Sequence, residues 1–317
     1  MSRSLDIVIV NWNTGGQLRA CLASIAAAAQ DGFVLNRVVV VDNGSKDGSA
    51  EGLQDFSVPL MVLRNRENRG FAAACNQGAQ GSAADYLLFL NPDVRLYPDS
   101  LARPIRFMEE PVNARIGICG IQLVDESGRV DRSCARFPTP RMFVGKMLGL
   151  TRWLPRVFPT HAMTEWDHGE NRGVDQVIGA FFLIRRSLFQ GLNGFDERFF
   201  VYFEEVDLSF RAARAGWSSF YLADARAVHR GGGSSEQVKA MRLFYSLRSR
   251  IQYRFKHFHR PSAVGVALAT LLLEPLPRLG VAAARRSPSS ALETLHGYAL
   301  LWGSIPRRLV PRSDGSR

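Results

Sequence analysis

The chain has 317 residues, of which 46% are hydrophobic, and a formal net charge of +11 at pH 7. This composition indicates a globular protein with a large core and excludes a disordered chain, while the lack of a CxxC pair among four cysteines argues against a zinc site. We expect the cysteines to be buried thiols in a reducing compartment. The N-terminal residues lead into an apolar run without the hydrophobic region of a signal peptide, so we expect a cytoplasmic protein.

The first hundred residues alternate short apolar runs with helical patterns. The runs, rich in β-branched residues or leucine and each followed by polar residues, occupy 5–10, 37–41, 60–64 and 87–90. Leu18, Leu22 and Ile25 recur at helical spacing after the first run, and a second helix is expected just before the fourth. This alternation predicts βαβ units, and therefore an α/β fold with a mostly parallel sheet flanked by helices.

Polar side chains cluster directly after these strands. In an open α/β sheet the carboxyl ends of the strands line the ligand crevice, so these side chains are candidates for binding a nucleotide. Asp42 can accept from a base imide or a ribose hydroxyl, although its segment also has the composition of an ordinary turn. Gly70 lets a ligand approach backbone N–H groups or simply begins a helix. The candidate nucleotide-binding residues are Asn11, Asn13, Asp42, Asn43, Gly70, Asn76 and Asn91.

The fourth strand runs directly into a carboxylate. It continues as Asn91-Pro92-Asp93, in which the proline holds the chain extended and places Asp93 at the binding edge. An ordinary turn is the alternative, because all three residue types favour turns. The chain has neither a GxGxxG fingerprint nor a GxxxxGK[ST] loop, which argues against a dinucleotide-dependent oxidoreductase and a P-loop NTPase.

Seven motifs follow one another in a defined order along residues 5–260. They read VIVNWN at 8–13, VDNGS at 41–45, NRGFAAACNQG at 68–78, LLFLNPDV at 87–94, GAFFLIRR at 179–186, GFDERFFVYFEEVDLSFRAARAGW at 194–217 and HRGGGSS at 229–235. In this order the sequence resembles the family 2 glycosyltransferases with a GT-A fold, and among them the rhamnosyltransferase-like branch that builds bacterial polysaccharides. The resemblance implies a Rossmann-like nucleotide-diphospho-sugar transferase domain at 1–240, with a nucleotide-binding half at 1–95 and an acceptor-side half at 96–240.

The resemblance implies a metal site at Asp93 and His229. The family has a DxD motif whose last acid ligates a divalent cation on the donor diphosphate, and here Asn91 departs from that pattern. His229 stands where the family has a histidine that contacts the metal or the diphosphate, just before glycines 231–233, which would let a loop fold over the donor. Mg²⁺ or Mn²⁺ suits such a site, because these cations accept one or two protein ligands together with phosphate oxygens.

The acids at 204–207 provide the candidate base. The family pattern is an acidic pair at a helix start whose second member deprotonates the acceptor hydroxyl, which implies Glu205, with the choice between Glu204 and Glu205 left open. Asp207 is expected to orient the base, although acids in a first turn also simply stabilise the helix. The implied reaction is a single displacement with inversion at the anomeric carbon and without a nucleophilic enzyme residue.

The implied activity is transfer of a hexose from a dTDP- or UDP-sugar, with dTDP-rhamnose preferred, to a saccharide or lipid-linked acceptor in polysaccharide synthesis. The alternative is a non-catalytic nucleotide- or nucleic-acid-binding protein on the same scaffold, but it has no need of both Asp93 and the Glu204–Glu205 pair. Residues 120–175 are expected to form acceptor-side loops, in which Trp166 and His168 are either sugar contacts or exposed packing residues.

The excess positive charge lies in the C-terminal region, 241–317. From residue 236 onwards the chain has fourteen Lys and Arg against four Asp and Glu. A stripe of apolar residues from 243 to 255 predicts an amphipathic helix with a basic and aromatic second face. The apolar run 262–273 is shorter than the roughly 20 residues of a membrane span and ends in a segment with two prolines, so we expect no crossing.

We expect this helical appendage to attach to an anionic surface at the inner face of the cytoplasmic membrane, with arginine pairs at 285–286 and 307–308 facing lipid. The alternative is an appendage that packs on the domain or on a second subunit, which leaves a homodimer open. Nucleic acid is not an expected partner, because the basic and aromatic residues alternate at helical spacing.

Overall fold

The computed structural model describes residues 2–231 and 239–304. They divide into two compact units: the first holds Met1–Pro138 and Thr160–Ser234, the second Thr139–Pro159 and Ser235–Arg317, as far as these ranges are described. The expected boundary at 240 therefore lies close to the end of the first unit. The segment 139–159, which we placed among the acceptor-side loops, belongs instead to the second unit.

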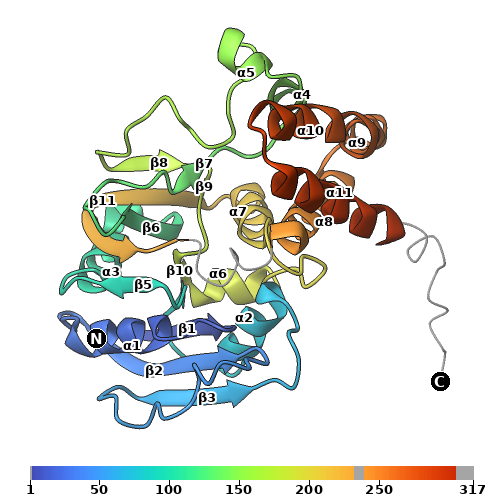
Figure 1. The fold of residues 1–317 in the computed structure, drawn as a ribbon. Helices are drawn as coiled ribbons and strands as arrows, with labels where there is room; N and C mark the ends of the chain where they lie inside the picture. Colours follow the sequence, from blue (N-terminus) through green and yellow to red (C-terminus); the bar gives the residue numbers. More distant parts are fainter. Residues whose placement is uncertain (1, 232–238, 305–317) are drawn as a thin grey trace, which may run out of the picture. The chain divides into compact units, whose positions relative to one another are not determined.

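The first unit is built on one mixed sheet with helices on both faces (Figure 1). Its strands are β1 Arg3–Asn11, β2 Phe33–Asp42, β3 Leu60–Arg64, β4 Tyr86–Leu90, β5 Val94–Leu96, β6 Ile116–Val124, β7 Cys134–Ala135, β8 Arg172–Val174, β9 Gln176–Val177, β10 Phe181–Arg185 and β11 Ser218–His229. Its helices are α1 Gln17–Ala27, α2 Phe71–Ala79, α3 Ala102–Glu109, the 3₁₀ turn η1 Pro111–Asn113, α6 Arg186–Gly191 and α7 Glu204–Arg214. The strands and helices expected in the first hundred residues are confirmed as β1 to β4, α1 and α2.

The strand order in the main sheet is β3-β2-β1-β4-β10-β6-β11-β5, with β8 also paired to β11. The first four strands are parallel to their neighbours in that half, as is β6 to β11, whereas β10, β5 and β8 run antiparallel to theirs. The expected α/β sheet flanked by helices is thus confirmed, with antiparallel strands inserted in its second half. Because β1 and β2 are parallel, Asn11 and Asp42 lie opposite each other at the carboxyl edge.

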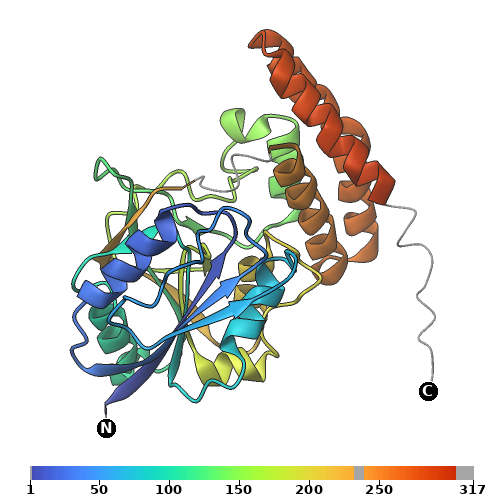
Figure 2. The same ribbon diagram turned by 60° about the horizontal axis from the view of Figure 1, so that its bottom comes forward.

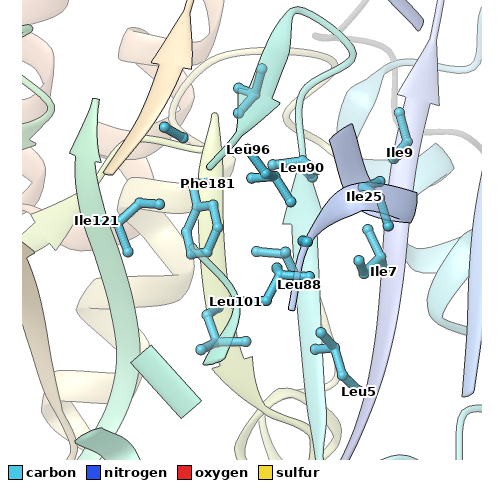
Figure 3. Close-up of a cluster of buried hydrophobic side chains, with 14 of the residues drawn as sticks. Leu5, Ile7, Ile9, Ile25, Leu88, Leu90, Leu96, Leu101, Ile121 and Phe181 are labelled. Atoms are coloured by element: carbon cyan, nitrogen blue, oxygen red, sulfur yellow. The ribbon is translucent and has the colours of Figure 1, made fainter. Parts of the chain in front are cut away.

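The core has two layers, one on each face of the sheet, and the side chains of β1 alternate between them. Leu5, Ile7 and Ile9 point to the face covered by α1 and α3, where they pack in one buried cluster (Figure 3). Val8 and Val10 point to the opposite face, which α2, α6 and α7 cover. Successive side chains of a strand alternate between faces, so both faces of β1 are buried and the polar residues are left at the ends of the strands.

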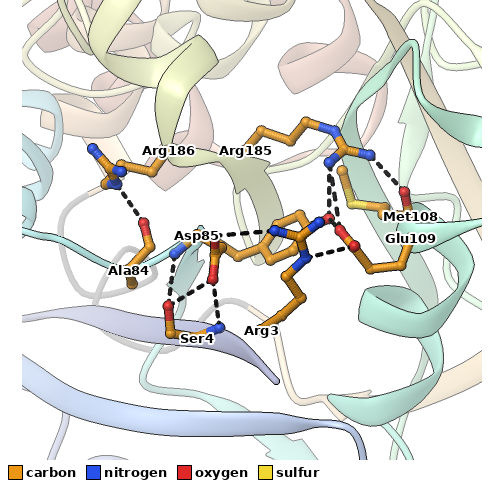
Figure 4. A network of polar contacts seen from close by, with 9 residues as sticks. Arg3, Ser4, Ala84, Asp85, Met108, Glu109, Arg185 and Arg186 are labelled. Atoms are coloured by element: carbon orange, nitrogen blue, oxygen red, sulfur yellow. Dashed lines mark hydrogen bonds and ion pairs between the residues drawn. The ribbon is translucent and has the colours of Figure 1, made fainter. Parts of the chain in front are cut away.

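A polar network fixes the edge of the sheet opposite the candidate site. Arg185, at the end of β10, donates to the carbonyl oxygens of Met108 (2.5 Å) and Ile116 (2.9 Å). Arg3, at the start of β1, donates to Glu109 at 2.6 Å (Figure 4). These contacts tie the ends of β1, β6, β10 and α3 together, and they leave the carboxyl edge free for binding.

The second unit is helical. Its elements are α4 Pro140–Met147, α5 Leu150–Trp153, α8 Lys239–His257, α9 Arg260–Leu268, the π-helical turn η3 Ala269–Leu273, α10 Pro275–Ala284 and α11 Pro288–Ser304. The expected amphipathic helix is confirmed as α8, and α11 lies alongside α8 and α10 (Figure 2).

The expected break at Pro275 is wrong. The chain stays helical from α9 through η3 and α10, which gives one helix of 25 residues, Arg260–Ala284. Among the described residues this is one helix that is long and apolar enough to cross a membrane by length and composition, a requirement that a core helix of a soluble protein can also meet. The run is therefore not too short for a span.

Candidate active site

The loops after β1 and β2 are held together by a buried asparagine. Asn11 is fully buried and donates from Nδ2 to Asp42 Oδ1 at 2.9 Å. The same nitrogen donates to the hydroxyls of Ser45 (3.1 Å) and Ser49 (2.9 Å), and Oδ1 accepts from the Thr14 hydroxyl. The amide is thus bonded within the protein and supports the two loops, and a nucleotide contact by Asn11 stays a prediction.

Asn13 and Asp42 form the rim of these loops. Asn13 has a left-handed φ of 50°, and its Oδ1 accepts from the backbone N–H of Lys46 at 2.8 Å. Asp42 ends β2 and has one carboxylate oxygen bonded to Asn11. A contact of either residue with a nucleotide stays a prediction.

Asn43 joins three parts of the next loop. Its Oδ1 accepts from Asn65 Nδ2 and from the backbone N–H of Arg69, both at 3.1 Å. Its Nδ2 donates to Asn68 Oδ1 (2.9 Å) and to the Gly70 carbonyl (3.2 Å). Like Asn11, this buried side chain shapes the edge, and its contact with a nucleotide stays a prediction.

Gly70 and Asn76 dock a distant segment of the same unit on α2. Gly70 has φ 88°, and Phe71 donates its N–H to the Phe200 carbonyl at 2.6 Å. Asn76 donates from Nδ2 to the Phe195 carbonyl and accepts from the Phe195 N–H, both at 2.9 Å. The close approach that Gly70 permits is made here by the chain itself, and a contact of Gly70 or Asn76 with a nucleotide stays a prediction.

The carboxylate of Asp93 and the imidazole of His229 face each other. β5 begins directly after Asp93 and pairs with the end of β11, which places His229 opposite Val94. His229 Nε2 lies 3.5 Å from Asp93 Oδ2, with both side chains nearly buried. On the other side of the ring, Nδ1 lies 3.7 Å from Asp131 Oδ2. The expected meeting of Asp93 and His229 is confirmed, and a second carboxylate joins them.

The segment Asn91-Pro92-Asp93 is both a turn and the carrier of a carboxylate. The Asn91 carbonyl accepts from the Val94 N–H at 3.2 Å, and its own N–H donates to the Ala180 carbonyl at 2.9 Å. Burial, and then the charge of Asp93, raise the pKa of the Cys21 thiol in α1. The sequence left open whether this segment is a turn or places a carboxylate at the edge of the sheet, and the structure shows both. A ligand contact by the Asn91 side chain stays a prediction.

Helix α7 begins with two acids on a strained stretch of backbone. Tyr202 and Phe203 precede it with left-handed φ values of 68° and 71°, a conformation that bulky residues rarely adopt. Glu204 is buried and Glu205 half-buried, and within the described residues one carboxylate oxygen of each is buried without a hydrogen-bond partner. Burial raises the pKa of both carboxyls, and the charge of Glu205 raises that of Glu204 further. Perturbed pKa values of this kind are typical of functional sites.

The two acids differ in their surroundings. After burial, the charge of Glu204 contributes to the raised pKa of Cys75, which places Glu204 towards α2. Glu205 is the more exposed of the pair and so the one more accessible to an acceptor. Whether Glu205 reaches the Asp93 edge stays a prediction.

Asp207 is part of the packing of α7. It is fully buried, and its Oδ2 accepts from Arg211 Nε at 2.7 Å. Arg211 also donates to the carbonyl oxygens of Leu192 (2.6 Å) and Gly194 (2.8 Å). This ion pair holds the turn before α7, which favours the structural alternative for Asp207 over a role in orienting the base.

Trp166 and His168 are buried, which corrects the expectation of exposed side chains. Their rings stack at 4.2 Å, and His168 is fully enclosed. The His168 carbonyl accepts from Gln122 (2.8 Å) and from the Tyr221 hydroxyl (3.0 Å). The loop therefore closes on the sheet through its aromatic residues, and neither ring is available to a sugar in this arrangement.

Residues 6–192, more than half of the chain, match the family described as "Glycosyl transferase family 2". The chain belongs to this family. As a family 2 glycosyltransferase it is a hexosyltransferase, so the alternative of a non-catalytic binding protein is not supported. The expected membership is confirmed.

Named relatives of this family 2 glycosyltransferase include two rhamnosyltransferases. N-acetylglucosaminyl-diphospho-decaprenol L-rhamnosyltransferase of Mycobacterium tuberculosis H37Rv is 29% identical over 256 residues, which cover 77% of this chain and 81% of that protein. Rhamnosyltransferase WbbL of Escherichia coli K12 is 31% identical over 171 residues, 53% of this chain and 61% of that protein. The chain is thus similar to rhamnosyltransferases.

Solved structures share the fold of this glycosyltransferase. The mannosyltransferase PcManGT from Pyrobaculum calidifontis, in complex with GDP-Man and Mn²⁺, has a TM-score of 0.56 at 17% identity, covering 98% of this chain and 82% of that one. GalNAc-T7 with UDP, GalNAc and Mn²⁺ has a TM-score of 0.54 at 15% identity, covering 90% and 59%. These likenesses confirm the expected GT-A fold.

The sequence of this glycosyltransferase did not indicate Asp131. The residue lies in a stretch without periodicity, and its position depends on a hairpin that returns from β6. The Val124–Val130 bridge and the bond from the Asp131 N–H to the Leu123 carbonyl (2.8 Å) form this hairpin. Residues 125–128 have the composition of a turn, but the sequence does not show which strand the returning chain pairs with.

Proposed function

We propose that the protein is an inverting, metal-dependent rhamnosyltransferase that transfers rhamnose from dTDP-rhamnose to a lipid-linked saccharide in the synthesis of a cell-surface polysaccharide. Similarity to two rhamnosyltransferases supports the sugar, and the name of the M. tuberculosis relative supports a lipid-linked acceptor. The observation that carries the proposal is the meeting of Asp93 and His229 at the carboxyl edge of a GT-A sheet, where a donor diphosphate would bind.

Asp93 and His229 fit a divalent cation. Metal–ligand bonds of about 2.0–2.2 Å place neighbouring ligand atoms roughly 3 Å apart, and the two facing atoms here are 3.5 Å apart. Within residues 2–231 and 239–304 no three His, Cys, Asp or Glu side chains form a set that could hold a metal ion. The remaining ligands would be phosphate oxygens and water, which Mg²⁺ and Mn²⁺ accept, and a bound cation would neutralise the leaving diphosphate.

Glu205 is the better candidate for the general base. It is less buried than Glu204, and its raised pKa brings a carboxylate closer to the range in which it accepts a proton from a hydroxyl. In the proposed step Glu205 takes the proton of the acceptor hydroxyl while that oxygen attacks the anomeric carbon. The bond from that carbon to the diphosphate breaks on the opposite face, so the configuration inverts.

The helical unit is proposed to lie on an anionic membrane surface, where a lipid-linked acceptor would be met. Between residues 260 and 304 the only acids are Glu274 and Glu293, and both are ion-paired. Large apolar side chains are exposed along the helix that starts at Arg260, namely Val264, Leu268, Leu272, Leu273, Leu276 and Val281. A crossing is disfavoured because Glu274, in the middle of the helix, pairs with Arg250 of the highly charged α8. Of the two arginine pairs expected to face lipid, 307–308 lies outside the described residues, as do glycines 232 and 233 of the expected loop.

The proposal is tested with dTDP-rhamnose and N-acetylglucosaminyl-diphospho-polyprenol as substrates. Replacement of the base in Glu205→Gln should lower kcat about 10²- to 10⁴-fold and leave the Kd for dTDP unchanged. Asp93→Asn should instead weaken Mn²⁺-dependent binding of dTDP, measured by calorimetry. Because burial raises the pKa of Glu205, kcat/KM of the wild type should rise with pH and reach half its maximum above the ordinary range of a glutamate carboxyl.

Asp99→Asn is the matched control, since Asp99 is an exposed acid of the same unit that pairs with Arg103. It should transfer sugar like the wild type. Wild-type turnover in Glu205→Gln would move the base to Glu204, and wild-type turnover in Glu204→Gln as well would contradict the mechanism.

A further inference from the structure

The imidazole of His229 lies between two carboxylates that reach it from different strands. Nε2 faces Asp93 at 3.5 Å and Nδ1 faces Asp131 at 3.7 Å. The Asp93 side chain is 12% exposed, whereas that of Asp131 is 46% exposed. Asp131 therefore lies at the outer side of the ring, and Asp93 at the inner side.

The backbone fixes this order. Val228, next to His229, is paired with Val124 of β6, and Val124 bridges Val130 on the returning chain of the hairpin. The Asp131 N–H donates to the Leu123 carbonyl at 2.8 Å, and the Arg230 N–H donates to the Asp93 carbonyl at 3.2 Å. The start of β5, the end of β11 and the hairpin after β6 thus bring the two acids to opposite sides of one ring.

A neutral imidazole has one N–H donor and one lone pair, and the group beside one nitrogen decides which nitrogen carries the proton. Without a cation each carboxylate favours the proton on the nitrogen beside it, and Asp93 is the nearer of the two. A cation between Nε2 and Asp93 would take the Nε2 lone pair and leave the proton on Nδ1, beside Asp131. Carboxylates that hold the far nitrogen of a metal-binding histidine set the tautomer and orientation of the ring and raise the basicity of the ligand.

We infer that Asp131 is a positioning residue that holds the His229 ring through Nδ1–H, so that Nε2 and Asp93 together face a divalent cation. The inference rests on the proposed metal-dependent function and assigns Asp131 a part in it. Asp131 touches neither cation nor substrate and acts through His229. Its removal should weaken cation binding without affecting the binding of nucleotide alone.

The test compares Asp131→Asn with the wild type by two measurements that do not need sugar transfer. The first is the affinity for Mn²⁺ in the presence of dTDP, measured by the electron paramagnetic resonance signal of free Mn²⁺. Loss of a carboxylate behind a metal-binding histidine typically costs 10- to 100-fold in affinity, and we expect a decrease of about that size. The second is the tautomer of His229 without a cation and with Mg²⁺ and dTDP, read from ring ¹⁵N shifts assigned with His229→Gln.

Glu126→Gln is the matched control, because Glu126 is an exposed acid of the same hairpin that pairs with Arg95. It should bind Mn²⁺ like the wild type. With Mg²⁺ and dTDP we expect the wild type to change to the Nδ1–H form, and Asp131→Asn to need a higher Mg²⁺ concentration for the same change. If the wild type binds Mn²⁺ and Asp131→Asn binds it equally with an unchanged ring, the inference is overturned while the metal proposal stands. If the wild type binds no Mn²⁺ but the tautomer depends on Asp131, the metal proposal falls and the positioning role stands.

Discussion

At Gly70 the fold leaves no room for a side chain, which makes this residue a sensitive test of the loop geometry. A Cβ there would lie 2.5 Å from the Phe200 carbonyl oxygen and 2.8 Å from the Phe200 ring, on a backbone with φ of +88°. Gly70→Ala should therefore lower the free energy of unfolding by about 3 kcal/mol, because the clash adds to backbone strain. Urea denaturation followed by tryptophan fluorescence measures this loss.

Gly81→Ala separates the clash from the strain. Gly81 also has a positive φ, +67°, but nothing lies within 4 Å of its added Cβ. Its replacement should cost about 1 kcal/mol, the strain of a left-handed alanine alone. Equal losses in the two variants would mean that the approach of Phe200 to Gly70 contributes nothing.

Some residues of the candidate site could be predicted from the sequence and others could not. Asp93 could be placed at the binding edge because a buried strand and a proline precede it, and His229 could be paired with it by family resemblance. The sequence could not show that the side-chain amides of Asn11 and Asn43 form hydrogen bonds within the protein. An asparagine that follows a strand has the same sequence pattern whether it binds a ligand or a neighbouring loop. Asp131 could not be predicted for a related reason: its neighbours in space belong to β6 and β11, and the sequence of its own segment does not show that they meet.

Among the elements, the helix Arg260–Ala284 departs most from its sequence prediction. Proline has no N–H to donate to the carbonyl four residues earlier and normally ends a helix. Here Trp302 Nε1 donates to that carbonyl, Leu271, at 3.3 Å, and the Glu274 N–H reaches back to Ala269 at 3.0 Å in a π turn. A side chain of α11 thus supplies a donor that Pro275 lacks, and a tertiary contact of this kind cannot be read from the sequence of one segment.

Glu274 is expected to be essential for this helix. It is buried and accepts from Arg250 and from Arg278 (2.8 Å). Glu274→Gln leaves buried cations uncompensated and should destabilise the helical unit by about 3–5 kcal/mol. Hydrogen exchange of peptides within 260–284 measures this loss separately from the stability of the other unit.

The destabilisation caused by Glu274→Gln should also depend on pH. Burial alone raises the pKa of Glu274, but Arg250 and then Arg278 outweigh it, so the pKa in the folded protein is below 4.5. The unfolded chain then binds more protons, so this stabilisation is complete above the unfolded pKa and disappears as pH falls through the folded one. Glu274→Gln should abolish that part of the acid sensitivity.

Arg254→Met is the contrasting change in the same cluster. Arg254 is fully buried over the Phe143 ring, and burial, then the charge of Arg250, lower its pKa to about 8. Methionine removes a cation whose burial is costly and keeps much of the packing, so this change should cost less than Glu274→Gln. A larger loss for Arg254→Met would mean that the cation itself, and not Glu274, holds the cluster together.

For the whole molecule, the uneven charge predicts where the protein binds in the cell. The exposed leucines of this helix and the exposed Arg285 and Arg286 together favour the surface of an anionic bilayer. Wild-type protein should sediment with phosphatidylglycerol vesicles and much less with phosphatidylcholine vesicles. Leu272→Glu combined with Leu276→Glu should abolish sedimentation, because two charges then enter the apolar face.

A double variant of the first unit serves as the control. Val34→Glu with Val112→Glu adds the same charges at exposed apolar positions of the GT-A unit and should sediment like the wild type. If the leucine variant turns a wild-type dimer into a monomer by analytical ultracentrifugation, and neither protein binds vesicles, the apolar face is a subunit interface and the membrane proposal is wrong.

The pairing of β5 with β11 has a consequence for biosynthesis. Asp93 meets His229 only after the strand that carries His229 has been made and added to the sheet, whereas the βαβ half that holds Asn11 and Asp42 consists of contacts between neighbours in sequence. Contacts between distant residues form late, because closing a long loop costs entropy before any bond is gained. A growing chain therefore completes the loops proposed to bind a nucleotide well before it has the pair proposed to hold a cation, and sugar transfer would become possible only when the sheet is complete.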